Sequence, residues 1–310
     1  MLKLGGMLKS TPAYLQITQE RLLGIRDELL ALLGECTLCP RLCRSQRHRG
    51  KTGFCKTGRK AIVSSYNLHF GEEPELVGEG GSGTIFFSFC NLGCVYCQNH
   101  PISDAGEGRD VTADELASVL LELQRLGAEN LNFVSPTHVV PQIVEALSKA
   151  REKGLRLPLV YNSGGYDSRA VIKRLGPIFD IYMPDIKYSR NQSAEKYSCV
   201  TDYWERCKES VLEMHRQVGD LMIDERGVAL RGLLIRHLVL PEDISGSSGV
   251  IDFVADSLSA NTYLNIMDQY RPCHKAYMHP KLMRRITDKE YADVVDYARS
   301  KGVQRGFEAL

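Results

Sequence analysis

Residues 90–97 read Cys-Asn-Leu-Gly-Cys-Val-Tyr-Cys, which places the thiols of Cys90, Cys94 and Cys97 in one short loop. Ten cysteines spread over a chain of 310 residues would give this three-point spacing by chance in only about one chain in a hundred. A structural metal site closes its coordination with four protein ligands, whereas a catalytic site keeps one position open. The loop therefore predicts a four-iron cluster in which one iron stays open to a small molecule.

A zinc knuckle is the alternative interpretation of this loop. Zinc prefers four protein ligands in a structural site, and three cysteines alone would leave it under-ligated. His100 is the spare ligand that stands closest in sequence. The spacing favours the open iron–sulfur cluster.

The loop follows the first of six apolar stretches that alternate with helical stretches, a pattern typical of parallel strands with helical crossovers. The predicted strands cover residues 84–89, 130–134, 159–161, 178–183, 232–240 and 263–267. The predicted helices cover residues 112–126, 141–153, 168–175, 204–218, 248–259 and 287–302. Thr112 is the expected N-cap of the first helix, with Glu115 at the capping-box position. Six such units predict an α/β fold, a partial (β/α)6 TIM-like barrel.

The part of the chain before this barrel differs in composition. Residues 11–34 show leucines at helical spacing, residues 36–58 are rich in cysteine and basic residues, and residues 61–68 read as a strand. We expect three parts: an N-terminal helix and cysteine-rich metal-binding segment (1–83), the barrel (84–280) and a C-terminal helical tail (281–310).

Four further cysteines lie in this N-terminal segment: Cys36, Cys39, Cys43 and Cys55. Four thiols at these spacings suit a closed site that holds zinc or an auxiliary iron–sulfur cluster, and unbound reduced cysteines are the third interpretation. The basic residues around them either offset thiolate charge, dock an acidic partner or form a solvated face; they are Arg41, Arg44, Arg47, Arg49 and Lys51. Cys199 and Cys207 are expected to be buried thiols on helices, and the role of Cys273 is undecided.

Composition excludes several classes of function. Hydrophobic residues make up 43% of the chain and charged residues 25%, which is typical of a soluble globular protein. The 39 basic and 38 acidic residues give a net charge of +1, so no global field favours nucleic acid or a membrane surface. No apolar run is long enough for a signal peptide or a spanning helix. We expect a cytoplasmic protein whose cysteines are ligands or free thiols.

The cysteine loop resembles that of the radical S-adenosylmethionine (SAM) superfamily, in which Cys-x3-Cys-x-aromatic-Cys holds a [4Fe-4S] cluster. In detail the chain resembles pyruvate formate-lyase activating enzyme-like proteins of the PflX type, with a cysteine-rich start, a Pro-Thr-His segment and an Asp-x-Lys segment, over residues 36 to 280. The resemblance implies that Cys90, Cys94 and Cys97 bind three irons and that SAM binds the fourth. Tyr96 is expected to pack against the adenine or to be an ordinary core residue.

The second predicted strand ends in Val-Ser-Pro-Thr-His, where many relatives carry Gly-Gly-Glu to hold the SAM amino group. At this place Ser135 and Thr137 are expected to offer hydroxyl acceptors, and His138 to reach the substrate or the methionine end of SAM. The alternative for Thr137 is an N-cap role at the helix that follows.

The third and fourth strands end in Tyr-Asn-Ser-Gly-Gly and Met-Pro-Asp-Ile-Lys. By resemblance, Lys187 binds the SAM carboxylate, and a monovalent cation is held by Asp185, Met183, Asn162 and Ser163. Asp185 and Lys187 stand two residues apart, so on a strand they would share one face. A simple ion pair at the barrel mouth is the alternative.

The fifth strand buries two basic residues in an apolar run. Arg236 matches an arginine that relatives place near the SAM carboxylate, and the cost of burying a cation argues for an anionic partner there. His237 points the opposite way and is expected to be a core histidine with satisfied hydrogen bonds. Gln269 and Tyr270, after the sixth strand, are further expected contacts of SAM or substrate.

The resemblance implies a radical SAM oxidoreductase that receives electrons from a flavodoxin- or ferredoxin-like donor and forms a 5′-deoxyadenosyl radical, with a glycyl radical enzyme as a possible protein substrate. Two alternatives remain at this stage. One is a radical SAM enzyme that acts on another peptide or a small molecule, and the other is a zinc- or cluster-bearing module that binds protein or RNA.

Overall fold

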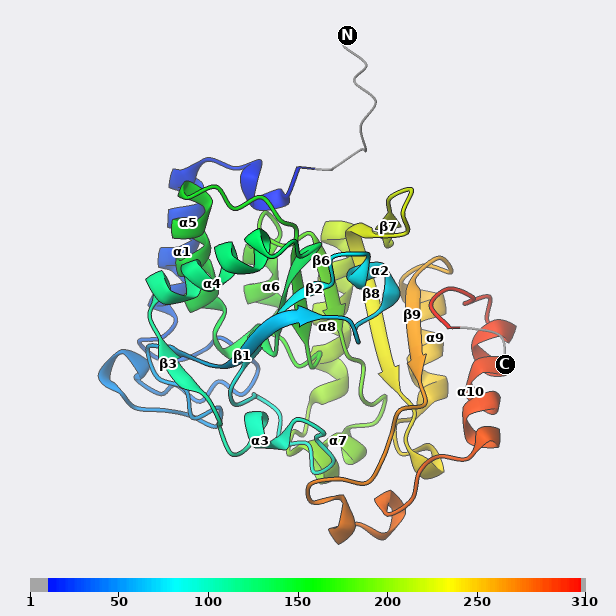
Figure 1. The fold of residues 1–310 in the computed structure, drawn as a ribbon. Coiled ribbons are helices and arrows are strands. Elements are labelled where there is room, and N and C mark those ends of the chain that lie inside the picture. The colour runs from blue at the N-terminus through cyan, green and yellow to red at the C-terminus, as the bar shows by residue number, and fades with distance from the viewer. Residues whose placement is uncertain (1–10, 308–310) are drawn as a thin grey trace.

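A nine-stranded sheet forms the centre of residues 11–307, the part of the chain that the computed structural model describes (Figure 1). Its order is β3-β1-β2-β4-β5-β6-β8-β7, and β9 pairs with β8. The strands are β1 (Ala61–His69), β2 (Ser82–Phe87), β3 (Arg109–Val111), β4 (Asn130–Val134), β5 (Leu159–Ser163), β6 (Ile181–Pro184), β7 (Met222–Ile223), β8 (Ala229–Leu238) and β9 (Tyr263–Met267).

Six of these strands run parallel, in the order β2, β4, β5, β6, β8 and β9. This confirms the α/β fold with a partial barrel. The predicted bounds of β4 and β9 are correct, while β5 continues through Ser163 and β8 begins earlier, at Ala229. The β6 strand begins only at Ile181, because Ile178 and Phe179 lie in the buried turn that follows α6.

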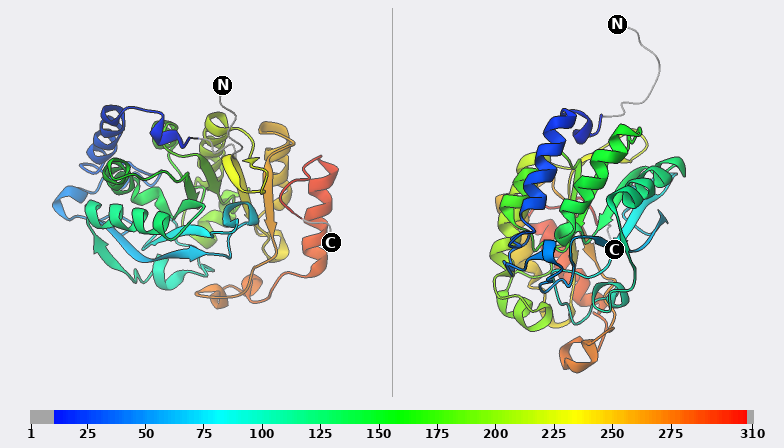
Figure 2. Two further views of the ribbon diagram at one scale, coloured as in Figure 1. Left: turned by 45° about the horizontal axis from the view of Figure 1, so that its top comes forward. Right: turned by 90° about the vertical axis from the view of Figure 1, so that its left-hand side faces the viewer.

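The helices follow the predicted alternation. They are α1 (Gln19–Ala31), α2 (Pro74–Val77), α3 (His100–Ser103), α4 (Ala113–Arg125), α5 (Val140–Glu152), α6 (Arg169–Leu175), α7 (Asn191–Ser198), α8 (Tyr203–Val218), α9 (Ser247–Ser257) and α10 (Asp288–Ser300). Helix α5 packs between α1 and α4, α6 packs on α8, and α9 packs on α10 (Figure 2). The longest helix that the sequence analysis did not predict is α7, which comes directly before α8.

Capping decides where α4 begins. The Thr112 hydroxyl accepts the backbone N–H of Glu115, and the Glu115 carboxylate accepts the backbone N–H of Thr112 at 2.8 Å. This is the predicted capping box, which satisfies two backbone donors that a helix start would leave unpaired. Thr287 and Glu290 form the same arrangement at α10.

The N-terminal segment joins the same sheet. Strand β1 pairs antiparallel with β2 and β3, and α1 packs against α5 and α6. The helix expected over 11–34 is shorter, since α1 begins at Gln19 after its N-cap Thr18. The backbone N–H of Ala13 donates to Asp180 Oδ1 at 2.8 Å, which ties the start of the segment to the turn before β6. The division of the chain at residues 83 and 280 stays a prediction.

His237 is fully buried on β8, as the strand alternation predicts. Its Nδ1 lies 2.6 Å from the Ile186 carbonyl oxygen, and its Nε2 lies 2.9 Å from the Ser247 hydroxyl. Both ring nitrogens are therefore satisfied without any ligand, which confirms the prediction of a core histidine. Burial lowers the pKa of His237 to about 4.

This pKa predicts that folding stability falls as the pH drops from 6.5 towards 4. In that window the imidazole binds a proton in the unfolded state but not in the folded state, so protonation lowers the free energy of the unfolded state. The loss of unfolding free energy from His237 between pH 6.5 and 5 is about 2 kcal/mol. Urea unfolding at the two pH values should show a smaller loss for His237→Gln than for the wild type. A loss in His237→Gln equal to that of the wild type would refute the assignment.

No helix of residues 11–307 is both long enough and apolar enough to cross a membrane.

Candidate functional site

The carboxyl ends of the parallel strands meet at one edge of the sheet, where polar loops surround a cavity of about 290 Å³. In a parallel barrel this edge is the usual place of the active site. Each of the six strands or the loop after it contributes to the lining. The residues are Cys90, Leu92, Cys94, Tyr96, Cys97, Gln98, Asn99, Ser103, Val134, Ser135, Asn162, Ser163, Gly164, Asp185, Lys187, Arg236, Leu238, Met267 and Gln269.

The three cysteines of residues 90–97 all line this cavity. The loop begins with Phe89 in the left-handed region, at φ 66°, and is fastened to α7 by backbone bonds from Gly93 and Val95 to the Ser198 and Tyr197 carbonyls. A helix that the sequence did not reveal thus fixes the loop.

Each of the three sulfur atoms has a hydrogen-bond partner. The Leu92 backbone N–H donates to Cys90 Sγ at 3.4 Å, and the Ser198 hydroxyl donates to Cys94 Sγ at 2.9 Å. The Ser103 hydroxyl lies 3.1 Å from Cys97 Sγ. Burial raises the pKa of Cys90 to about 11 and that of Cys94 to about 12, so both are thiols until a metal replaces their protons.

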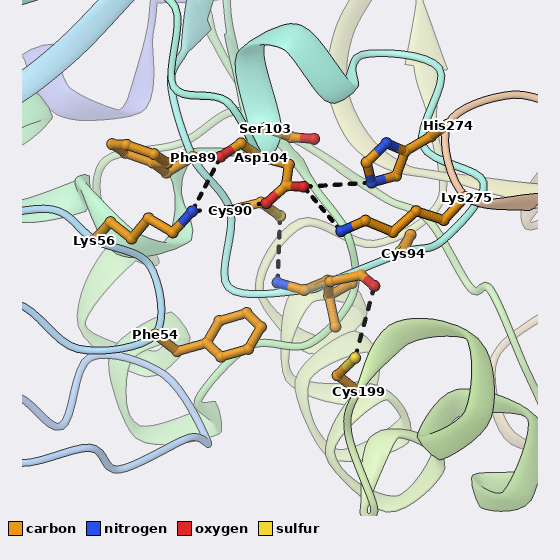
Figure 3. A pocket seen from close by; sticks show the side chains of 12 residues that line it. Phe54, Lys56, Phe89, Cys90, Cys94, Ser103, Asp104, Cys199, His274 and Lys275 are labelled. Atoms are coloured by element: carbon orange, nitrogen blue, oxygen red, sulfur yellow. Dashed lines mark hydrogen bonds and ion pairs between the residues drawn. The ribbon is translucent and has the colours of Figure 1, made fainter.

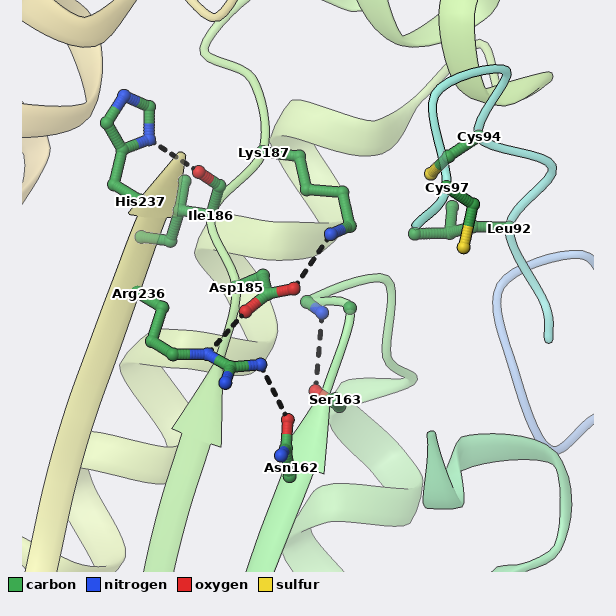
Figure 4. A network of polar contacts seen from close by, with 12 residues as sticks. Leu92, Cys94, Cys97, Asn162, Ser163, Asp185, Ile186, Lys187, Arg236 and His237 are labelled. Carbon is green, nitrogen blue, oxygen red and sulfur yellow. Dashed lines mark hydrogen bonds and ion pairs between the residues drawn. The ribbon is translucent and has the colours of Figure 1, made fainter. Parts of the chain in front are cut away.

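A charged network faces the cysteines across the cavity (Figure 4). Lys187 Nζ lies 2.7 Å from Asp185 Oδ2, and Arg236 Nε lies 2.8 Å from Asp185 Oδ1. Burial alone would raise the pKa of Asp185, but the two cations hold it below its usual value. One carboxylate thus orients two cations towards the space between strands and cysteines.

Two acidic residues that the sequence reasoning missed complete this network. Arg236 Nη1 lies 3.5 Å from Glu72 Oε2 and 3.8 Å from Glu73 Oε1. Burial raises the pKa of Glu72 to about 7, although the Arg236 guanidinium opposes the shift. The anionic partner expected for Arg236 is therefore supplied by the protein, from Asp185 and from the segment between β1 and α2.

The comparisons with known proteins agree with this geometry. The profile of the Radical SAM superfamily matches residues 84–229, which run from β2 to the start of β8. An uncharacterised protein of Methanocaldococcus jannaschii is 30% identical over 295 residues, which are 92% of this chain and 80% of that protein. The chain belongs to the radical SAM superfamily.

More distant similarities point the same way. The pyruvate formate-lyase-activating enzyme of Clostridium pasteurianum is 25% identical over 183 residues, which are 56% of this chain and 68% of that enzyme. The crystal structure of a radical SAM methyltransferase from Sphaerobacter thermophilus superposes with a TM-score of 0.51 at 14% identity, over 72% of this chain and 65% of that one. The latter match shows a shared fold, and it spans slightly less than two thirds of the methyltransferase.

Membership of the radical SAM superfamily implies a [4Fe-4S] cluster and SAM, and the cysteine loop fits such a cluster. The three thiols line one cavity and leave one coordination position open, which suits a cluster that binds a small molecule better than a structural zinc ion. His100, the spare ligand of the zinc alternative, instead stacks on His274 with ring centroids 4.7 Å apart.

Two of the side-chain oxygens expected to hold a monovalent cation, those of Asn162 and Asp185, are already paired with the Arg236 guanidinium in this radical SAM protein. Arg236 Nη2 donates to Asn162 Oδ1 at 2.9 Å, in addition to its bond with Asp185. Met183 lies in the core and does not line the cavity. The monovalent-cation site stays a prediction.

The structure brings Ser135 to the cavity but not Thr137 or His138. The Thr137 hydroxyl donates to Asp167 Oδ1 at 2.7 Å, and His138 Nε2 lies 2.9 Å from the Ser88 carbonyl oxygen. The N-cap alternative for Thr137 is wrong, because α5 begins at Val140 and its cap residue is Val139.

Asp167 explains why Thr137 turns away from the cavity. Its buried carboxylate accepts hydroxyl hydrogen bonds from Thr137, Tyr161 and Ser163, at 2.7, 3.0 and 2.6 Å. Ser163 lines the cavity as predicted, yet its hydroxyl is used here. Asp167 thus braces the ends of β4 and β5 from behind the cavity.

Tyr96 lines the cavity with a largely buried ring. Its hydroxyl donates to Tyr188 at 2.6 Å, and the hydroxyls of Tyr188 and Ser198 lie 2.8 Å apart. A chain of hydroxyl groups thus leads from Tyr96 to Cys94. The adenine contact stays a prediction, as does that of Gln269, which also lines the cavity. Tyr270 lies outside it and donates to the Leu282 carbonyl.

The other cysteines show one error of prediction. Cys207 is buried on α8, as expected, but Cys199 is exposed and follows the end of α7. The Cys273 thiol donates to the Tyr96 carbonyl at 3.1 Å. In the N-terminal group Cys36, Cys39 and Cys55 are buried and Cys43 is exposed; the metal predicted there stays a prediction.

A second cavity, of about 280 Å³, borders the other side of the cysteine loop (Figure 3). Cys90, Leu92, Cys94 and Ser103 line both cavities. In its lining the Asp104 carboxylate lies 3.1 Å from Lys275 Nζ, 3.4 Å from His274 Nε2 and 3.6 Å from Lys56 Nζ. Basic groups thus outnumber acidic ones at this opening.

The Ser198 hydroxyl gives a measurable prediction. A hydrogen bond to a cluster sulfur stabilises the reduced, more negative state, so its loss lowers the reduction potential. For Ser198→Ala we expect a midpoint potential lower by on the order of tens of millivolts, measured by EPR-monitored redox titration. Ser168→Ala is the control, because this N-cap residue of α6 makes no side-chain cap hydrogen bond and lines neither cavity beside the cysteine loop. Equal midpoint potentials in the wild type, Ser198→Ala and Ser168→Ala would contradict a hydrogen bond from Ser198 to a cluster ligand.

Proposed function

We propose that this radical SAM protein cleaves SAM reductively and uses the 5′-deoxyadenosyl radical to take a hydrogen atom from a protein, with a glycine residue of a glycyl radical enzyme as the first candidate. The observation that carries the proposal is the cavity in which Cys90, Cys94 and Cys97 face Lys187. When bound, the cluster supplies the electron that breaks the S–C5′ bond of SAM.

The side chains around the cavity have separate roles in this proposal. Lys187 receives the SAM carboxylate, because it lines the same cavity as the cysteines and Asp185 holds it in place (Figure 4). Burial opposes the charge of Lys187, but Asp185 and the cysteines raise its pKa above the usual value, so it stays protonated. Arg236 is bound by Asp185, Asn162 and the glutamates and acts by positioning Asp185.

A protein substrate is supported by the segment that follows β9. Tyr277, Met278 and Met283 have exposed fractions of 68%, 65% and 58%, and exposed large apolar side chains that gather on one segment are typical of protein-binding surfaces. The segment is joined to the cysteine loop, since the backbone N–H of Lys275 donates to the Val95 carbonyl at 2.8 Å. The similarity to the activating enzyme of C. pasteurianum supports a glycine as the target.

The deciding experiment follows the hydrogen atom. The anaerobic protein, reconstituted with iron and sulfide and reduced with dithionite, is mixed with SAM and a glycyl radical enzyme labelled with α-deuterated glycine. We expect deuterium in 5′-deoxyadenosine and the EPR doublet of a glycyl radical. Unlabelled 5′-deoxyadenosine without that doublet would leave SAM cleavage intact and refute the glycine target. Absence of 5′-deoxyadenosine from a protein with a reduced cluster would refute the whole proposal.

The electron donor is proposed to be a flavodoxin- or ferredoxin-like protein of the cytoplasm. The basic opening beside the cysteine loop, with Lys56 and Lys275, supports the approach of an acidic donor (Figure 3). Charge complementarity of this kind acts mainly on the association rate and weakens with salt.

Lys56→Glu tests this donor surface. We expect about tenfold slower SAM cleavage with reduced flavodoxin at low salt, because the electrostatic attraction is reversed. Dithionite needs no docking surface, so the rate with this reductant should not change. An equal rate with flavodoxin for variant and wild type would place the donor elsewhere.

A further inference from the structure

The four cysteines of the N-terminal segment are gathered into one small region. The backbone N–H of Cys36 donates to the Ser45 carbonyl and that of Arg44 to the Cys36 carbonyl, both at 3.0 Å. The backbone N–H of Leu42 donates to the Cys39 carbonyl at 3.1 Å, and Cys43 Sγ lies 3.6 Å from the Ser45 hydroxyl.

The loop before Cys55 closes tightly on this group. A Cβ atom at Gly53 would stand 2.3 Å from Cys43 Sγ, so the glycine is required for the close approach. Leu42, Arg44 and Lys56, which flank Cys43 and follow Cys55, take positive φ angles of 45°, 51° and 51°. Such backbone is rare for residues with side chains, and here it folds the cysteines towards each other.

A buried arginine provides the independent observation. Arg47 is 1% exposed, and among residues 11–307 no carboxylate forms an ion pair with it. Its Nη1 donates to the His138 carbonyl at 2.8 Å and contacts Cys36 Sγ at 3.8 Å, and its Nη2 is buried without a partner within that range of residues. A buried guanidinium needs a compensating negative charge, and the cysteines are the available source.

We propose that Cys36, Cys39, Cys43 and Cys55 form a second, tetrathiolate metal centre, with Arg47 as its buried counter-cation. Four thiolates around zinc or around a cubane iron–sulfur cluster both leave a net negative charge. The sulfur atoms do not yet converge on one point within residues 11–307, so metal binding draws them together, as is usual where metal binding and local folding are coupled.

This centre also supports the radical SAM loop. Two residues after Cys39, Arg41 Nε donates to the Asn91 carbonyl at 2.5 Å. Phe54, the neighbour of Cys55, lies against Gly93, and its ring carries the Arg41 guanidinium 3.3 Å above its centroid. Metal at the second centre therefore fixes the position of the loop that holds Cys90 and Cys94, whatever the substrate is.

The test uses the full chain in which the three cysteines of the radical SAM loop are replaced, so that only the N-terminal cysteines remain as proposed metal ligands. In the triple variant Cys90→Ala, Cys94→Ala, Cys97→Ala, isolated without oxygen, we expect about one zinc, or about four irons with sulfide, per chain. Elemental analysis and X-ray absorption at the metal edge decide between the two and count sulfur ligands. A folded triple variant without bound metal, or a metal with oxygen and nitrogen ligands, would overturn the proposal.

Arg47 is tested in the same background by competition with a chelator. Loss of a group that supports metal ligands typically weakens affinity about 10- to 100-fold, which we expect for Arg47→Met, whereas Arg47→Lys should recover part of it. Lys173→Met, an exposed change on α6, is the control. If Arg47→Met does not fold, the polar neutral variant Arg47→Gln decides in its place, because metal affinity equal to that of the parent without the charge would refute the counter-cation role.

Discussion

Replacement of Cys94 by alanine is expected to reduce the formation of 5′-deoxyadenosine to the background level, a loss of at least about a thousandfold. Cys94 is one of three thiols that line the cavity, and its sulfur also receives the Ser198 hydrogen bond. Two cysteines cannot hold a cluster with one open iron in place. Chromatographic quantification of 5′-deoxyadenosine after reduction with dithionite measures the effect.

Cys207→Ala is the matched control, because Cys207 is a buried thiol on α8 that does not line the cavity. It should keep cluster and activity. Metal analysis adds a second readout, since the Cys94 variant should lose the iron bound by Cys90, Cys94 and Cys97 but keep the metal of the tetrathiolate centre. SAM cleavage at the wild-type rate in Cys94→Ala would refute the cluster assignment.

Replacement of Lys187 by methionine should weaken SAM binding by about 10- to 100-fold, the usual cost of a lost hydrogen bond to a charged group. The variant should fold, because Asp185 keeps its bond to Arg236 and no buried charge is left alone. Equilibrium dialysis of SAM against the reconstituted protein gives the dissociation constant, with iron content checked in parallel.

Lys173→Met serves as the control here as well, since it removes a lysine from the exposed face of α6. Its affinity for SAM should equal that of the wild type. Unchanged affinity in Lys187→Met, with a full complement of iron, would mean that another cation receives the carboxylate.

The parts of the fold set by local patterns could be predicted from the sequence. The capping box of Thr112 and Glu115 and the apolar run of β4 each depend on neighbours in the chain. The same is true of the cysteine loop and of the pairing of Asp185 with Lys187. Alternation on β8 correctly separated Arg236, which lines the cavity, from His237, which is buried behind it.

The parts missed depend on contacts between distant segments. Glu72 meets Arg236 across 164 positions of the chain, and its own surroundings in sequence give no sign of this. Thr137 was expected at the cavity because it follows a strand end, yet Asp167 binds its hydroxyl from behind. A turn such as that from Ser135 to His138 leaves side-chain direction open until its partners are known.

The cysteine loop forms the common wall between two cavities, one on the strand side and one beside Lys56 and Asp104. If SAM binds in the cavity on the strand side and the electron donor docks beside Lys56, as proposed above, the two reach the cysteines through different cavities. In steady-state terms, we then expect no competition between donor and SAM: a higher concentration of one should not inhibit the other, and enzyme, donor and SAM should form a ternary complex during turnover.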